Sequence, residues 1–191
     1  MTKKVALLVE NGSEELEFIA PLDIMRRANI EVDLIAANNE DYIISSHNVR
    51  ILVDKKLNEI DNILDYDAIV IPGGMPGATN LRDNRKVIEF YQTMYKNDKL
   101  VAAICAAPIV LSKAEITKDK EVTSYPGFEE QIISKTYNNK KGVVVDNNVI
   151  TAQGPALAME FGYEIVNYLL NDNSANNIRK AMLIPVLKNN L

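Results

Sequence analysis

The feature that most constrains the fold is an alternation between short apolar runs and segments with helical periodicity. Compact apolar runs occupy 4–10 (KVALLVE), 31–37 (EVDLIAA), 67–74 (DAIVIPGG) and 100–104 (LVAAI). Strands that are buried on both faces of a parallel sheet have this composition. Helical patterns follow them at 14–28, 85–96, 106–113 and 155–170. The order predicts an open, doubly wound α/β sandwich with helices on both faces of a mostly parallel sheet.

Three segments depart from that alternation. Residues 42–54 and 142–152 have the pattern of hairpins, and the second is expected to turn at Asn147–Asn148. The tail from 175 to 191 has the pattern of a final helix that is interrupted at Pro185. No repeat or low-complexity linker divides the 191 residues, so one domain over 1–191 is expected.

Composition excludes several classes of function. Lys plus Arg is 21 against 26 Asp plus Glu, and this net charge of −5 argues against nucleic acid as a partner. No window approaches the ~20 apolar residues of a membrane span, and the N-terminus is expected to form a strand rather than a signal peptide. With one cysteine and one histidine, neither an internal disulfide nor a metal site is expected, and a reducing cytoplasm is the expected location.

The single cysteine, Cys105, lies where the run LVAAI stops and a helical pattern starts. Small neighbours, Ala103, Ala106 and Ala107, allow a sharp bend of the kind called a nucleophile elbow. A helix N-terminus would lower the pKa of the thiol below the ~8.5 of a free cysteine. A buried structural cysteine is an equal alternative at this point, because free Cys is among the most buried residue types.

A second unusual position is Glu17, in the helical segment 14–28. Its neighbours three, four and seven residues later are Ala20, Pro21 and Ile24, so the carboxyl lies along an apolar stripe. Burial would raise the pKa of Glu17, and a protonated Glu17 could then donate a hydrogen bond to Cys105. The alternative is a solvated glutamate in the first turn of a helix.

Glycines follow the apolar run 67–72. Gly73 and Gly74 allow backbone N–H groups to face a ligand or an oxyanion, although a tight turn would also explain them. His47 is expected on the surface or at an interface. The stretch containing Gly154 and Pro155 has the pattern of a helix start.

Taken together, four stretches resemble the DJ-one-like branch of the DJ-one/ThiJ/PfpI superfamily: 12–30, 66–81, 101–111 and 151–156. The resemblance implies a flavodoxin-like sandwich, similar to class I glutamine amidotransferases, that forms a homodimer and requires no cofactor. It implies Cys105 as nucleophile or oxidation site and Glu17 as its hydrogen-bonded acid. The backbone donors around the sulfur would then belong to Gly73, Gly74 and Ala106. The helix that carries Leu16, Ile19 and Ala20 is the expected dimer interface.

The chain departs from the family pattern at several positions. Tyr125 stands where the best-known members have a histidine near the nucleophile, so a Cys–His couple is absent. His47 replaces an arginine of the anion-binding surface, whereas Arg27 matches its companion. The residue after the cysteine is Ala106 rather than the histidine of PfpI-type proteases, so a protease function matches poorly. Tyr125, Arg27, His47, Gly154 and Pro155 remain candidates for lining the pocket.

Two functions use the same thiol. As an enzyme, the resemblance implies glutathione-independent glyoxalase or deglycase-type chemistry on small reactive aldehydes, converting methylglyoxal to lactate through Cys105 and Glu17. As a redox sensor or protective protein without catalytic activity, the chain would meet peroxide and oxidise Cys105 to a sulfinate. A thiamine-related role has no supporting residue, and a binding module with an inert cysteine is the remaining alternative.

Overall fold

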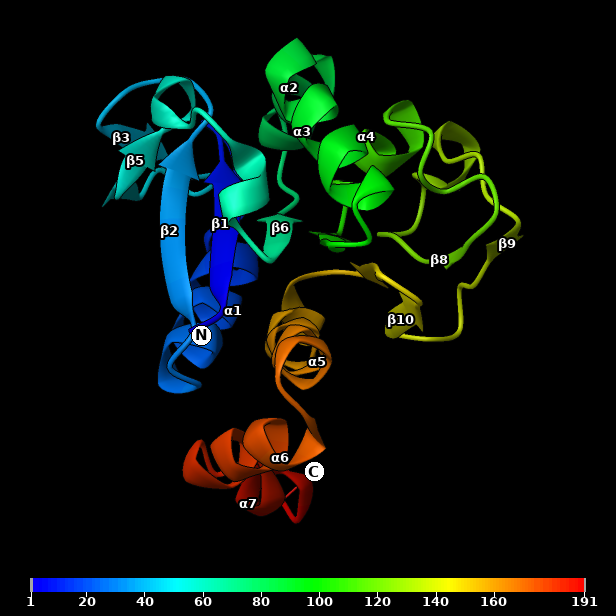
Figure 1. The fold of residues 1–191 in the computed structure, drawn as a ribbon. Coiled ribbons are helices and arrows are strands. Elements are labelled where there is room, and N and C mark those ends of the chain that lie inside the picture. Colours follow the sequence, from blue (N-terminus) through cyan, green and yellow to red (C-terminus); the bar gives the residue numbers. More distant parts are fainter. Residues whose placement is uncertain (1, 191) are drawn as a thin grey trace.

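The computed structural model describes residues 2–190 and contains a seven-stranded sheet at its centre (Figure 1). The spatial order of the strands is β10-β11-β7-β6-β1-β2-β5. All neighbouring pairs are parallel except β10 and β11, which form a hairpin. The bounds are β1 Lys4–Val9, β2 Glu31–Ala36, β5 Lys55–Lys56, β6 Ala68–Ile71, β7 Leu100–Ile104, β10 Val143–Asp146 and β11 Val149–Ala152.

Helices cover both faces of this sheet. The core on one face contains α1 (Glu15–Arg27), α5 (Ala158–Leu169) and α6 (Asp172–Ala181), and the core on the other contains α2 (Gly77–Asp83), α3 (Arg85–Lys96) and α4 (Pro108–Lys113). Figure 1 shows α2–α4 and α5–α6 on opposite sides of the strands. All five residues of β7 are completely buried, with Val101 and Ala103 in one core and Ala102 and Ile104 in the other. The predicted flavodoxin-like α/β sandwich is therefore confirmed, and its apolar strands are the ones buried on both faces.

The predicted hairpins are also confirmed. Strand β3 (Tyr42–Ile44) pairs with β4 (Arg50–Leu52), and β10 pairs with β11 around a turn at Asn147 and Asn148. A further small sheet joins β8 (Glu121–Val122) to β9 (Thr136–Tyr137). Short 3₁₀ helices span Leu57–Glu59, Ile63–Asp65, Glu129–Gln131 and Pro155–Leu157.

The C-terminal helix breaks slightly earlier than predicted. Helix α6 ends at Ala181, and Leu183 adopts a left-handed conformation with φ of 62°. Helix α7 (Ile184–Lys188) then begins, with Pro185 in its first turn, where proline is tolerated. Among the described residues, no helix has the length and apolar character that crossing a membrane requires.

Candidate active site around Cys105

Cys105 occupies a strained turn directly after the central strand β7. Its φ of 64° lies in the left-handed region, which costs a non-glycine residue about 1–2 kcal/mol. Both backbone groups are held by neighbouring segments: the N–H donates to the carbonyl of Ala152 at 2.9 Å, and the carbonyl accepts from the N–H of Tyr125 at 2.9 Å. The side chain is only partly buried. The predicted elbow is therefore present, and it directs the sulfur away from the strand.

The helix after this turn is shorter than predicted. It begins at Pro108 rather than Ala106, with Ala107 as its N-cap, and it contains only six residues. Because the partial charge at a helix end comes from its aligned peptide groups, so short a helix is a weak source of positive potential.

Glu17 lies in the first turns of α1 and is completely buried. Its Oε2 accepts a hydrogen bond of 2.8 Å from the backbone N–H of Gly73. Its Oε1 is also buried and accepts no hydrogen bond from residues 2–190. Close packing of α1 on α5 fixes this position, since a Cβ at Gly162 would lie 2.9 Å from Cα of Pro21. The predicted buried carboxyl is confirmed.

Gly73 lies where Glu17 and the Cys105 turn meet. A Cβ at this position would lie 2.6 Å from Cβ of Cys105, 2.8 Å from Oε2 of Glu17 and 2.9 Å from the nitrogen of Ala106. These distances are too short for any side chain, so only glycine fits at this position. The expected donor role needs one correction: the N–H of Gly73 serves the Glu17 carboxyl, whereas the N–H groups of Gly74 and Ala106 are directed at the sulfur.

The two side chains perturb each other's titration. Burial raises the pKa of Glu17 to about 7, and the nearby charge of Glu14 adds to this effect. Burial first, and then the charge of an ionised Glu17, raise the pKa of Cys105 to about 12, although the amides of Gly74 and Ala106 lower it. The helix N-terminus therefore does not by itself set the thiol pKa, because burial and the protonation state of Glu17 also act on the sulfur. As a pair, Glu17 and Cys105 lose one proton near pH 7 and the second near pH 12, and they share one proton in between.

Tyr125 and Gly154 border the turn. The backbone of Tyr125 holds the Cys105 carbonyl, whereas its side chain is 47% exposed. Gly154 packs under the ring, since a Cβ there would lie 3.1 Å from Cδ2 of Tyr125. Pro155 begins the 3₁₀ helix after Gly154 and is partly buried.

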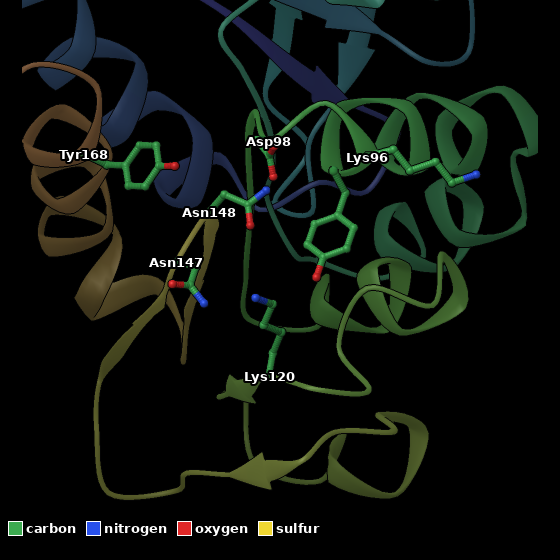
Figure 2. Close-up of a pocket in the computed structure, with 7 residues that line it drawn as sticks. Lys96, Asp98, Lys120, Asn147, Asn148 and Tyr168 are labelled. Atoms are coloured by element: carbon green, nitrogen blue, oxygen red, sulfur yellow. The ribbon is translucent and has the colours of Figure 1, made fainter.

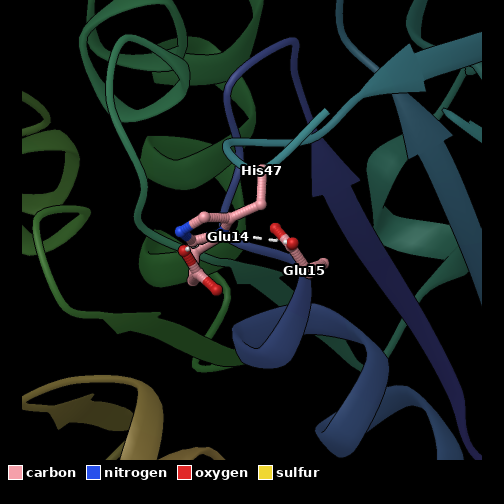
Figure 3. A group of neighbouring side chains, drawn as sticks. All are labelled: Glu14, Glu15 and His47. Carbon is pink, nitrogen blue, oxygen red and sulfur yellow. Dashed lines mark ion pairs between the residues drawn. The ribbon is translucent and has the colours of Figure 1, made fainter. Parts of the chain in front are cut away.

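His47 lies beside the start of α1, near two glutamates (Figure 3). Its Nδ1 is 3.4 Å from Oε2 of Glu14 and 3.1 Å from Oε1 of Glu15. The hydroxyl of Ser46 donates to Glu14 at 2.7 Å and lies 3.1 Å from Nδ1 of His47. Potential ligand atoms of His47, Glu14 and Glu15 lie within 4.8 Å of one another, a grouping that the sequence did not indicate. His47 thus contacts the helix that carries Glu17, through its first turn.

Arg27 is not part of this site within one chain. Ten residues of α1 separate it from Glu17, which is about 15 Å along the helix axis. Its Nε instead donates to Asp23 at 2.7 Å, and the side chain is half exposed.

The sequence analysis did not identify Glu14 as a member of the site. Its backbone N–H donates to the carbonyl of Gly73 at 3.1 Å, and its charge raises the pKa of Glu17. No helical spacing could indicate it, because Glu14 is the N-cap of α1 and has an extended backbone.

The fold and the site define a class of protein: a flavodoxin-like α/β sandwich with a cysteine on a strained turn after a central strand and a buried carboxyl beside it. The family model described as "DJ-1/PfpI family" matches residues 3–168. The chain therefore belongs to the DJ-1/PfpI family, and the resemblance seen in the sequence is confirmed.

Named relatives agree with this assignment over almost the whole chain. Protein dj-1beta of Drosophila melanogaster is 34% identical over 185 residues, which cover 96% of this chain and 98% of that protein. The Parkinson disease protein 7 homolog of Danio rerio is 30% identical, with 95% and 97% covered. The crystal structure of Drosophila DJ-1beta superposes with a TM-score of 0.90 over 96% of this chain and 98% of that one, at 34% identity. Oxidized Toxoplasma gondii DJ-1 superposes with a TM-score of 0.88 over 95% and 98%, at 31% identity.

Proposed function

We propose that the chain is a cysteine-dependent enzyme that acts on small reactive aldehydes, with glyoxalase or deglycase-type chemistry such as conversion of methylglyoxal to lactate. The observation that carries the proposal is the meeting of the Cys105 turn and the buried Glu17 carboxyl at Gly73, with the amides of Gly74 and Ala106 beside the sulfur. Such a pair supplies a nucleophile and a group that moves protons.

The position of the shared proton decides whether the sulfur is reactive. Two features favour the carboxyl as its holder. Oε1 of Glu17 is buried, and among residues 2–190 only the Cys105 thiol acts as a side-chain donor to this carboxyl, so it is a poor place for negative charge. The sulfur, by contrast, is partly exposed and faces the N–H groups of Gly74 and Ala106. With Glu17 protonated and Cys105 ionised, the buried carboxyl is neutral and the negative sulfur faces hydrogen-bond donors.

Starting from a Cys105 thiolate and a protonated Glu17, the conversion of methylglyoxal to lactate proceeds in three steps. The sulfur bonds to the aldehyde carbon of methylglyoxal while the carbonyl oxygen takes the proton from Glu17, giving a hemithioacetal and a carboxylate. The Glu17 carboxylate removes the proton from the same carbon and returns it to the neighbouring carbon through an enediol, while the hydroxyl proton moves from the first oxygen to the second, giving a lactoyl thioester. Water then splits the thioester, which releases lactate and restores the pair. The net reaction adds water and needs no oxidant, because one carbon is oxidised and its neighbour reduced.

Lactate formation tests this proposal. Wild-type protein is mixed with methylglyoxal without glutathione, and lactate is measured enzymatically against an equal concentration of free cysteine. Activity is expected to disappear in Cys105→Ser and to fall by about 100-fold or more in Glu17→Gln, since positioned proton transfer contributes that much. The matched control is Asn58→Ala, in a short exposed helix remote in sequence from both residues. Turnover no faster than that of free cysteine would refute the enzyme proposal.

A second function is favoured by the unpaired Oε1 of Glu17. When protonated, Oε1 could donate to an oxygen on a Cys105 sulfinate, formed from one thiol and two peroxide molecules with release of two waters. The description of the Toxoplasma relative as oxidized agrees with this alternative. Limited peroxide followed by mass spectrometry is expected to add two oxygens at Cys105 before the methionines react. Oxidation of methionines first would exclude the sensor function.

We also propose that the chain acts as a homodimer in a reducing cytoplasm. Leu16 is 58% and Ile19 is 42% exposed on α1, which leaves an apolar surface beside the site. Sedimentation velocity is expected to give a dimer for the wild type and a monomer for Leu16→Glu/Ile19→Glu. A monomeric wild type at micromolar concentration would contradict the dimer.

A further inference from the structure

A polar cavity of about 640 Å³ lies at the opposite end of β7 from Cys105 (Figure 2). It is bordered by the last turns of α3 and α5, the loop before β7, the residue before β8 and the β10–β11 turn. The side chains used below are Tyr95, Asp98, Lys120, Asn147, Asn148 and Tyr168. Its volume is within the range of small-molecule sites, and the five-residue strand β7 separates it from the sulfur by about 17 Å.

Lys120 is the unusual residue of this cavity. Its side chain is only 11% exposed, yet its ammonium group makes no hydrogen bond within residues 2–190. Its Nζ forms a long ion pair of 3.8 Å with Oδ1 of Asp146. Both oxygens of Asp146 already accept hydrogen bonds, from the N–H of Glu121 at 2.8 Å and from Nδ2 of Asn147 at 2.9 Å.

The remaining contact of the ammonium is with an aromatic ring. Nζ of Lys120 lies 5.7 Å from the centre of the Tyr95 ring, a weak cation–π interaction. An ammonium group has three N–H donors, and none of those of Lys120 has an acceptor among residues 2–190, so they are free to bind a ligand at the mouth of the cavity. Figure 2 shows Lys120 directed toward Asn147 and Asn148, inside the cavity, whereas Lys96 points away from it.

The other polar groups of the cavity indicate which chemical groups a ligand would need besides an anionic one. Asn148 is 9% exposed and its Nδ2 donates to the carbonyl of Lys99 at 3.0 Å, which leaves Oδ1 as an acceptor. The carboxylate of Asp98 is a second acceptor at the cavity. These two acceptors are complementary to a hydrogen-bond donor, such as a hydroxyl or amino group, on a bound molecule. The carboxylate of Asp98 at the cavity and that of Asp146 beside Lys120 also disfavour a doubly charged phosphate, because both repel it.

We propose that this cavity binds a small organic monocarboxylate that carries a hydroxyl or amino group. The carboxylate accepts hydrogen bonds from Lys120, and the hydroxyl or amino group donates to Asn148 or Asp98. Tyr95 and Tyr168 line the same cavity. This site shares no residue with the Cys105 site and stands independently of the proposed aldehyde chemistry.

The test is an NMR titration of ¹⁵N-labelled full-length protein with 3-hydroxypropionate, its neutral amide and inorganic phosphate. Saturable shifts of the Asn147 and Asn148 amides are expected with 3-hydroxypropionate only. Affinity is expected to fall by about tenfold or more in Lys120→Met, the size of one lost charge-assisted hydrogen bond. Lys120→Arg keeps the charge and is expected to retain binding, as is Lys96→Met, the control lysine at the same cavity.

Several results would overturn the proposal: no saturable shift, equal shifts with the neutral amide, tighter binding of phosphate, or binding that survives Lys120→Met. Shifts confined to Gly73, Gly74 and Ala106 would place the anion at the Cys105 site instead and would also overturn it. If Lys120→Met does not fold, the comparison of 3-hydroxypropionate with its neutral amide on the wild-type protein still tests whether the cavity binds a carboxylate.

Discussion

The backbone N–H of Gly73 lies 2.8 Å from Oε2 of Glu17, although the two residues are 56 positions apart in the sequence. This hydrogen bond occupies one carboxyl oxygen and leaves Oε1 free to face the shared proton. It also joins the loop after β6 to the first helix, and both lie against the Cys105 turn.

Gly73→Ala is expected to disrupt the site through steric overlap. The added methyl would contact Oε2 of Glu17 and also Cβ of Cys105 and the nitrogen of Ala106, and the last two atoms are fixed by the backbone of the turn. We expect a loss of about 2 kcal/mol or more in the free energy of unfolding, the usual cost of overpacking, measured by urea denaturation. Gly154→Ala is the matched control, since its added methyl meets the exposed Tyr125 ring, which can move. Equal stability of both variants would contradict this description of Gly73.

The stability of the protein is expected to fall between about pH 4.5 and pH 7 because of the Glu17–Cys105 pair. The folded pair loses its first proton near pH 7, whereas an unfolded glutamate loses its proton near 4.5, so the stabilising contribution is complete below 4.5 and is lost as the pH rises to 7. The shift corresponds to about 3 kcal/mol. Urea denaturation at several pH values is expected to show this slope in the wild type and a shallower one in Glu17→Gln. Glu10, whose pKa is raised by burial, contributes with the same sign to both proteins. Identical slopes would contradict a buried, perturbed Glu17.

Glu14→Gln is expected to make Cys105 react at lower pH. The Glu14 charge raises the pKa of Glu17, so its removal lets the pair lose its first proton earlier. We expect a downward shift of less than about one pH unit in the alkylation midpoint, because the carboxylate is near the surface and is screened. Asp23→Asn, farther along the same helix and paired with Arg27, is the control. An unchanged or raised midpoint in Glu14→Gln would exclude this coupling.

Tyr125→Phe is expected to leave the lactate-forming rate within about twofold of the wild type, since the lost hydroxyl supplies no general base. The contact that matters is the backbone N–H to the Cys105 carbonyl, and this substitution keeps it. The side chain is half exposed. A tenfold loss of rate with intact folding would instead assign the phenol a part in the reaction.

The fold and the two central residues could be predicted from the sequence because each depends on local pattern. Apolar runs gave the strands, the small residues around Cys105 gave the elbow, and the apolar neighbours of Glu17 gave its burial. These signals lie within one element or at its end, where periodicity carries the information.

The incorrect predictions about the site concern features that depend on tertiary packing. The N–H of Gly73 donates to Glu17 because α1 packs against the loop after β6. The local sequence around Gly73 contains no signal for that packing. The thiol pKa could not be derived from the helix N-terminus, because that helix has only six residues and because burial and Glu17 also act on the sulfur. Arg27 was assigned to the site by resemblance, whereas helix geometry places it about 15 Å from Glu17. The Lys120 cavity combines five segments that are distant in sequence, so no motif could indicate it.

The most direct test of the central claim, that Glu17 holds the proton shared with Cys105, is the pH dependence of Cys105 alkylation, followed by mass spectrometry. A midpoint near pH 7, below the ~8.5 of a free thiol, is predicted for the wild type, with a shift to higher pH in Glu17→Ala, which has no group to take the proton. A wild-type midpoint far above that of a free thiol, moving to lower pH in Glu17→Ala, would show that the proton stays on sulfur and would contradict the account.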